Sequence, residues 1–167
     1  MTSQSLPVQS STTPAFSASR LRDLVLATRS DAAAPVLRLG LAAVMFPHGA
    51  QKLLGWYGGW GYDATMSWFA SIGIPAILGI LAILADFAGG LALIAGLGTR
   101  IAAFGIAVNM LVATLLVHLP NGFFMNWSGA QKGEGVEYHL LVVAIAAVLV
   151  IGGAGRFSVD RAIARKL

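Results

Sequence analysis

Residues 75–120 decide the fold, and they read PAILGILAILADFAGGLALIAGLGTRIAAFGIAVNMLVATLLVHLP. Two long apolar runs, 75–97 and 99–119, follow one another here, and their only formally charged side chains are Asp86 and Arg100. Each run matches the roughly 20 residues that a helix needs to cross about 30 Å of hydrocarbon. Because the link between them allows only a tight hairpin, the stretch predicts two antiparallel, neighbouring membrane helices.

Two further apolar runs, about 35–54 and 136–152, flank this hairpin. Pro35 and Pro75 stand at the starts of the first and second runs, where proline costs no helical hydrogen bond. Of the 167 residues, 57% are hydrophobic and only 11% are charged, against roughly 25% charged residues in soluble domains. The sequence therefore predicts an all-α integral membrane protein, a bundle of four transmembrane helices over 35–155.

The basic residues gather at one end of this predicted bundle. Nine of the eleven precede or open the first run, lie between the second and third, or follow the fourth: Arg20, Arg22, Arg29, Arg38, Arg100, Arg156, Arg161, Arg165 and Lys166. Only Lys52 and Lys132 fall on the other side. The positive-inside rule predicts that both termini are cytoplasmic, in a bacterial inner membrane. Because these charges flank apolar runs, the expected partner is the lipid bilayer, not nucleic acid.

The N-terminal segment 1–34 is expected to be a cytoplasmic tail without a signal peptide, because its only apolar run is far too short for one. Residues 1–19 are rich in Ser, Thr and Pro and are expected to be disordered. Residues 21–29 predict a short helix on the membrane surface. Residues 156–167 are expected to form a basic cytoplasmic tail.

All tryptophans and tyrosines lie on the outer side of the predicted bundle: Trp56, Tyr57, Trp60, Tyr62, Trp68, Trp127 and Tyr138. Anchoring alone would place such rings at both faces of a bilayer. We therefore predict that Trp60 and Trp68 help to cover a ligand pocket. Between the first two spans, Asp63 is expected to cap a short interfacial helix that ends at Ile72.

Polar side chains also occur inside the apolar spans. Counted at 1.5 Å per residue, Asp86 lies about 16 Å below the outer end of its span, and Asn109 lies at a similar depth. His48 and Lys52 are one helical turn apart on a shared face. An ionisable residue within a span is by default a functional hypothesis. The alternative for Asp86 is a purely structural hydrogen bond, for example to Asn109.

The remaining polar candidates lie near the outer surface. Glu137 either complements the N-terminal dipole of the fourth span or forms an ion pair with Lys52. A haem held by His48 and His118, or a metal ion held by these two with Asp86 and Glu137, has no supporting motif, so no metal site is predicted. The chain has no cysteine, which excludes iron–sulfur and thiolate chemistry for the chain by itself.

Small residues at four-residue spacing suggest contact faces between the spans. Ala88, Ala92 and Gly96 repeat in this way in the second span, and Ala103 and Ala107 do so in the third. Such small-xxx-small patterns let helix backbones approach closely. In a chain this rich in alanine and glycine, chance spacing explains the pattern nearly as well.

Several short motifs resemble one known family. They are RLG at 38–40, HG at 48–49, QKL at 51–53, GIP at 73–75, DFAGGL at 86–91, GLGTR at 96–100, GEGVEY at 133–138 and GAGRFSVD at 153–160. In this order and spacing, over about residues 35–162, the chain resembles the DoxX family of small bacterial four-helix membrane proteins. Members of that family usually carry Glu where this chain has Asp86.

The resemblance implies a quinone-linked membrane oxidoreductase, or a membrane subunit of one, with quinone as the expected cofactor. The candidate catalytic residues are Asp86, His48 and Glu137, and the candidate ligand-binding residues are Lys52, Trp60, Trp68, Asn109 and His118. The alternative is a non-catalytic accessory or anchoring subunit of a larger membrane complex, which the lack of cysteine favours. A transporter ranks last, because inverted repeats and broken helices are not evident.

Overall fold

The computed structural model describes residues 25–29 and 31–166, and every regular element in this part of the chain is helical. The tail expected at 1–19 lies outside the described residues. Of the surface helix expected over 21–29, only 25–29 are described, and of these only residues 25 and 26 are helical.

In the described part of the chain, three helical segments are long and apolar enough to cross a membrane. They are α2 (Ala33–Leu54), α4 (Ala76–Ala95) and the segment Thr99–Asn121, which comprises α5 (Thr99–Ala113), the π-helical turn η2 (Thr114–His118) and the 3-10 turn η3 (Leu119–Asn121). A shorter apolar helix, α6 (Glu137–Gly152), has 16 residues. The four helical segments coincide with the four predicted runs to within about two residues at each end.

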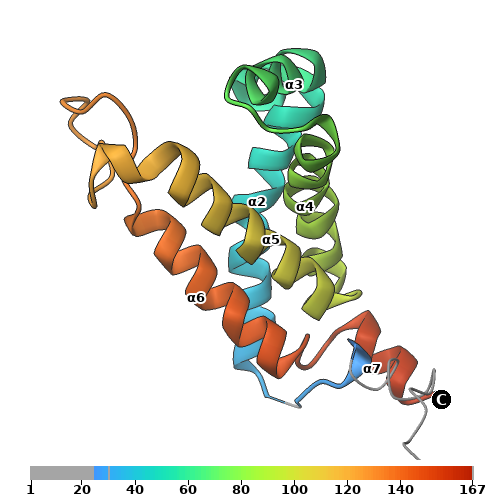
Figure 1. Ribbon diagram of the computed structural model, residues 1–167. Coiled ribbons are helices and arrows are strands. Elements are labelled where there is room, and N and C mark those ends of the chain that lie inside the picture. The colour runs from blue at the N-terminus through green and yellow to red at the C-terminus, as the bar shows by residue number, and fades with distance from the viewer. Residues whose placement is uncertain (1–24, 30, 167) are drawn as a thin grey trace, which may run out of the picture.

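Figure 1 shows how these elements are arranged. Helices α2 and α4 run side by side, while α5 and α6 form a second pair that is inclined to the first. The short helices η1 (Trp56–Gly58) and α3 (Gly61–Ser71) lie at one end of the bundle, as does the loop 122–136. The last helix, α7 (Val159–Ala164), lies at the opposite end. We refer to these as the α3 end and the α7 end.

Helices α2 and α4 approach through glycines. A Cβ atom at Gly49 would overlap the backbone of Asp86 and Phe87, and one at Gly90 would overlap the backbone of Phe46. The spacing of Ala88, Ala92 and Gly96 had indicated a different face, and that prediction is wrong for Ala88, which is exposed. Glycine permits the closest backbone approach, so the glycines, and not the alanine repeat, set this interface.

The surface of the bundle is strongly apolar. A core cluster that includes Leu41, Met45, Leu93, Ile106 and Leu149 fills the interior. Large hydrophobic side chains nevertheless stay exposed along the helices, among them Val36, Ile77, Leu81, Ile94, Ile101, Phe104, Leu115, Leu141 and Ile151. Soluble monomers rarely expose apolar patches of this extent. The fold is that of a helical membrane protein, whose outward faces are covered by lipid.

The short helix α3 begins earlier than the sequence indicated. It starts at Gly61, and Asp63 lies in its first turn, so the prediction that Asp63 is the capping residue is wrong. Gly61 has a φ of +75°, which redirects the chain two residues before Asp63. Thr65 and Phe69 form the buried face of α3, and Phe69 packs on Gly79 of α4.

The α7 end is tied together by two buried charged residues, Arg38 and Asp160. Arg38 donates to the carbonyl oxygens of Leu93 and Ile94 at 2.7 Å each, and to that of Phe157 at 3.1 Å. The carboxylate of Asp160 accepts from the backbone N–H groups of Gly98 and Thr99 at 2.6 and 3.0 Å. The first N–H and last C=O groups of a helix have no partner within it. These two side chains, which we call the terminal cluster, therefore cap the facing ends of α4 and α5.

Candidate functional site

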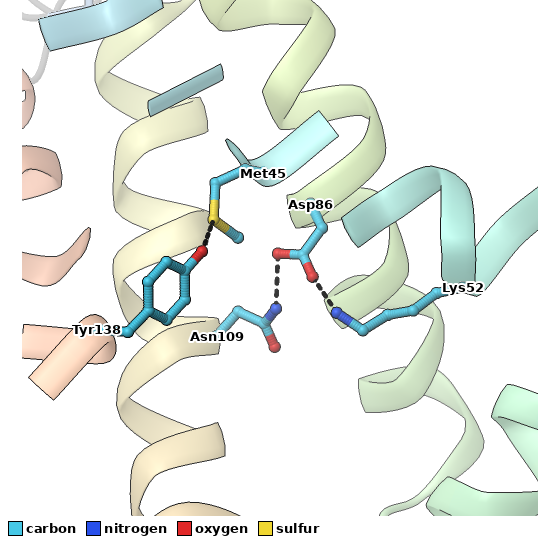
Figure 2. Close-up of polar contacts among 5 residues, drawn as sticks. All are labelled: Met45, Lys52, Asp86, Asn109 and Tyr138. Carbon is cyan, nitrogen blue, oxygen red and sulfur yellow. Dashed lines mark hydrogen bonds and ion pairs between the residues drawn. The ribbon is translucent and has the colours of Figure 1, made fainter. Parts of the chain in front are cut away.

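The centre of the candidate site is Asp86, whose side chain is fully buried in the middle of α4. The ammonium group of Lys52 on α2 donates to its Oδ2 atom at 2.5 Å. The Nδ2 atom of Asn109 on α5 donates to its Oδ1 atom at 2.8 Å. Figure 2 shows Lys52 and Asn109 approaching the carboxylate from different helices. We call Lys52, Asp86 and Asn109 the carboxylate triad.

Burial explains why Asp86 needs both partners. An unpaired carboxylate in an apolar interior is very costly, and a buried charge is normally paired and hydrogen-bonded. The hydrogen bond to Asn109 considered from the sequence is present. The ion pair considered between Lys52 and Glu137 does not form, because Lys52 pairs with Asp86 and the Glu137 carboxylate accepts from the backbone N–H of Met125 at 2.7 Å.

Asp86 lies at different distances from the outer ends of the two helices that meet beside it, α2 and α4. The close approach at Gly49 places Asp86 level with a residue only five positions from the end of α2 at Leu54. Five residues of helix span about 8 Å, against the 16 Å counted along α4 alone. The two helices are staggered, and this stagger brings Lys52 within reach of Asp86.

A small pocket of about 240 Å³ opens beside the triad at the α3 end. Its walls come from the end of α2, from η1 and the following loop, and from α3; they are Gln51, Lys52, Gly58, Gly59, Trp60, Thr65, Trp68 and Phe69. Pockets for drug-sized ligands hold about 300–1,000 Å³, so this one suits a single-ring group. Lys52 is both a pocket residue and a member of the triad.

Aromatic rings dominate one side of this pocket. The ring centres of Trp60 and Trp68 are 6.2 Å apart, with their planes inclined at 70°. Trp68 also contacts Phe69, at 5.4 Å between ring centres. Edge-to-face pairs of this kind are favourable and hold the rings in a defined arrangement.

A separate row of rings lies between α2, η2 and α6. The ring centres of His118 and His139 are 4.0 Å apart, those of His139 and Tyr138 are 5.3 Å apart, and those of Tyr138 and His48 are 6.1 Å apart. The Tyr138 hydroxyl donates to the sulfur of Met45 at 3.5 Å, as Figure 2 shows. His48 therefore contacts Tyr138 and His118 contacts His139, and neither histidine belongs to the triad.

Glu137 and its neighbour Glu134 hold the loop between η3 and α6. The Glu134 carboxylate accepts from the backbone N–H of Asn126 at 2.6 Å, as that of Glu137 does from Met125. Both carboxylates thus serve as caps for loop backbone. No group of three or more His, Cys, Asp or Glu side chains is placed to hold a metal ion in the described part of the chain.

The predicted site residues thus divide into three sets. Lys52, Asp86 and Asn109 meet in the triad, whereas Lys52, Trp60 and Trp68 line the pocket. His48, His118 and Glu137 lie elsewhere. Sequence reasoning missed the pocket residues Gln51, Thr65 and Phe69 and the terminal cluster of Arg38 and Asp160. For Asp160, its place in the GAGRFSVD motif was the available signal.

Comparison with known proteins agrees with the motifs quoted above. The DoxX family model matches residues 33–119. The chain belongs to the DoxX family. It is also similar to the inner membrane protein YqjF of Escherichia coli (strain K12), with 30% identity over 112 residues that cover 67% of this chain and 82% of that protein. No solved structure matches it.

The DoxX match has a direct bearing on the site. Residues 33–119 include α2, α3, α4 and α5, and therefore every residue of the triad and of the pocket. The apolar helices and the inner membrane relative together support a bacterial inner membrane location for this DoxX protein.

Proposed function

We propose that this DoxX protein binds a quinone head group in the pocket at the α3 end and exchanges protons through Lys52 and Asp86. It would act as a quinone-linked oxidoreductase or as the membrane subunit of one. The observation that carries the proposal is the double position of Lys52, which lines the pocket and also forms the ion pair with the buried Asp86.

The residues present suit such a group. Trp60 and Trp68 offer flat surfaces, and stacking on an aromatic ring contributes about 0.5–1.5 kcal/mol beyond the buried area. A quinone, when bound, would take up two electrons from a reduced donor substrate or from a redox partner subunit, and two protons. An ammonium group at the wall stabilises negative charge that develops on a carbonyl oxygen. Asp86, held between Lys52 and Asn109, keeps that ammonium group in place and accepts or returns its proton.

A second function, as a non-catalytic subunit, is favoured by the amino-acid composition. A chain without cysteine carries no iron–sulfur cluster or thiol centre of its own. Electrons for the quinone would then come from a partner subunit that holds the redox centre. In this case the pocket would position the quinone, or would serve only as a contact between subunits.

The membrane arrangement is part of the proposal. We place α6 as a fourth span, α3 in the outer interface, and both termini in the cytoplasm, on the strength of nine basic residues at one end. A cysteine introduced at Ser128 should react with an impermeant thiol reagent added to intact cells, and one introduced at Ser3 should not. The reverse labelling would move the pocket to the cytoplasmic leaflet.

A quinone titration tests the pocket. The purified protein is titrated with a short-chain quinone analogue in a calorimeter, so that the readout does not depend on the tryptophans that the variants replace. The double variant Trp60→Leu/Trp68→Leu keeps apolar bulk but loses the ring surfaces, and its affinity should fall about tenfold or more, as two lost stacking contacts imply. The matched control is Trp127→Leu, in the other loop, where the side chain is 88% exposed. Equal affinity in all three proteins would contradict quinone binding here.

Two further measurements separate the enzyme from the subunit. Gentle purification from the native membrane should yield quinone with the chain alone if it is the enzyme, and a stoichiometric redox partner if it is the subunit. Asp86→Asn keeps the shape and one acceptor oxygen for Asn109 but cannot titrate, and it leaves Lys52 free to turn toward the pocket. It should therefore insert and fold normally yet lose quinone-linked turnover. Full turnover in a well-folded Asp86→Asn protein would end the proton-exchange proposal.

A further inference from the structure

The row of rings beside the triad contains a second candidate site, formed by His118 and His139. Their ring centres are 4.0 Å apart, with planes inclined at 41°. His118 ends the π-helical turn η2, and His139 lies in the first turn of α6. Single π turns inside α-helices occur frequently at functional sites. The two imidazoles come from different segments of the chain and meet near the α3 end of the bundle.

His118 is held in one tautomer. Its Nδ1 atom lies 2.9 Å from the carbonyl oxygen of Glu134, and since a carbonyl only accepts, Nδ1 must donate. In a neutral imidazole the other nitrogen, Nε2, then carries a free lone pair. Histidines that bind metal ions almost always donate their second ring N–H to a carbonyl or carboxylate in this way.

His139 is buried, and one of its ring nitrogens is unsatisfied. The residue is 5% exposed, and its Nδ1 atom has no hydrogen-bond partner among the described residues. An unsatisfied buried polar atom in a native protein calls for a specific explanation, such as an ion or a water molecule. This nitrogen, which lies one helical turn after Gly135, is a second observation, independent of the ring contact, that points to a ligand at this place.

We propose that His118 and His139 bind one divalent first-row transition metal ion. Imidazole nitrogen suits zinc, copper and nickel ions. Two imidazoles on one zinc ion at about 2.0–2.1 Å have ring centres about 5 Å apart, so binding requires the observed pair to open by about 1 Å. The nearby carboxylates of Glu134 and Glu137 are engaged by loop N–H groups, which leaves the remaining coordination positions to water. This site goes beyond quinone binding and does not depend on it.

Metal titration of the full-length protein tests the site. The protein is prepared without a polyhistidine tag. Binding of Zn²⁺ is measured by calorimetry, and binding of Cu²⁺ is measured by electron paramagnetic resonance. The wild type should bind one equivalent of metal, and the copper spectrum should show nitrogen ligands. His118→Gln and His139→Gln should each weaken binding at least tenfold. His48→Gln, which replaces the only other histidine, should bind as the wild type does.

Two results would overturn the site. One is the lack of saturable binding of one equivalent in the wild type, which would make the ring pair a packing contact. The other is unchanged affinity in the well-folded His118→Gln protein. His118 is the less buried of the pair, so this variant should fold even if His139→Gln does not, and unfolding temperatures of each variant verify this.

Discussion

Two buried aspartates in this protein are satisfied in opposite ways. Among the described residues, Asp160, 1% exposed, accepts from the backbone N–H groups of Gly98 and Thr99 alone. In the same part of the chain, Asp86, 0% exposed, accepts from the side chains of Lys52 and Asn109 alone. Backbone donors are fixed by their helix, whereas side chains can rotate away. The contacts at the α7 end are therefore fixed and structural, whereas the partners of Asp86 toward the α3 end can change.

The two basic residues repeat this contrast. Arg38 is 3% exposed and donates to three backbone carbonyls, two at the end of α4 and one in the loop before α7. The side chain of Lys52 is 28% exposed, makes one ion pair and borders the pocket. A guanidinium group presents several donors in a fixed fork, while an ammonium group is a mobile point charge. Arginine thus suits the structural role and lysine suits the exchange of partners.

The largest effect is expected from Arg38→Met, which keeps the length of the side chain but removes its donors. Three backbone carbonyls lose a charged donor, and bonds to charged groups contribute about 1.5–3 kcal/mol each without adding fully. The free energy of unfolding, measured by SDS titration in mixed micelles, should fall by about 3 kcal/mol or more. Arg165→Met, at an exposed position of the same end, is the control. A decrease in the free energy of unfolding of less than about 1 kcal/mol would refute a structural role for the Arg38 contacts.

A smaller loss is expected where α2 and α4 touch beside the triad. In Gly49→Ala the new Cβ would overlap the backbone of Phe87, and overpacking of this kind costs about 1–3 kcal/mol. Because the shift also separates Lys52 from Asp86, quinone affinity should fall with stability. Gly40→Ala, on the same helix with open space around it, should be neutral or slightly stabilising. If Gly49→Ala and Gly40→Ala were equally stable, the contact at Gly49 would not be what sets the stagger between α2 and α4.

The same amide substitution at the two aspartates compares the ends directly. Asp160→Asn leaves one fixed N–H without an acceptor, so the free energy of unfolding should fall by about 1–3 kcal/mol. Asp86→Asn should cost less, because Lys52 can turn toward the pocket and water. Unfolding titrations of both variants under one condition give the comparison. If Asp86→Asn proves the more damaging, the triad is the stronger structural element and the contrast is reversed.

The smallest effect is the coupling between Lys52 and Asp86. In a double-mutant cycle with Lys52→Met and Asp86→Leu, the interaction energy should be about 0.5–1 kcal/mol, because Lys52 is partly exposed and an unpaired Asp86 is neutralised by taking up a proton. The double variant should be less stable than the wild type by nearly the sum of the two single losses, since Asp86→Leu also leaves Asn109 without an acceptor. A coupling above about 3 kcal/mol would show that the pair is a fixed structural bond.

Much of the fold could be predicted because the thickness of the bilayer sets the length of a helix that crosses it. The runs 35–54, 75–97, 99–119 and 136–152 were evident from the sequence, and all are helical. The start of α3 was missed, because the left-handed turn at Gly61 decided it and not the Asp63 cap. Helix α7 and the terminal cluster were missed as well, since their partners are backbone groups of α4 and α5 that are far away in the chain.

For the candidate site, residue types could be predicted better than their partners. Asp86, Lys52 and Asn109 stand out because polar groups are costly in apolar spans. Which of these residues pair with one another could not be predicted. The lipid-exposed and the buried faces of these helices are both apolar, so the periodicity of the sequence hardly distinguishes the two faces. Lys52 was considered as a partner of Glu137, which caps the loop instead.

Composition and motif order by themselves determined that this is a helical membrane protein of the DoxX family, because the length of apolar runs and the spacing of short motifs are local properties of the chain. Only the tertiary structure decided which polar groups meet. The close approach of α2 and α4 at Gly49 and Gly90 sets their stagger, and that stagger carries Lys52 to Asp86. Contacts of this kind depend on how whole helices slide and rotate against one another, which no single stretch of sequence specifies.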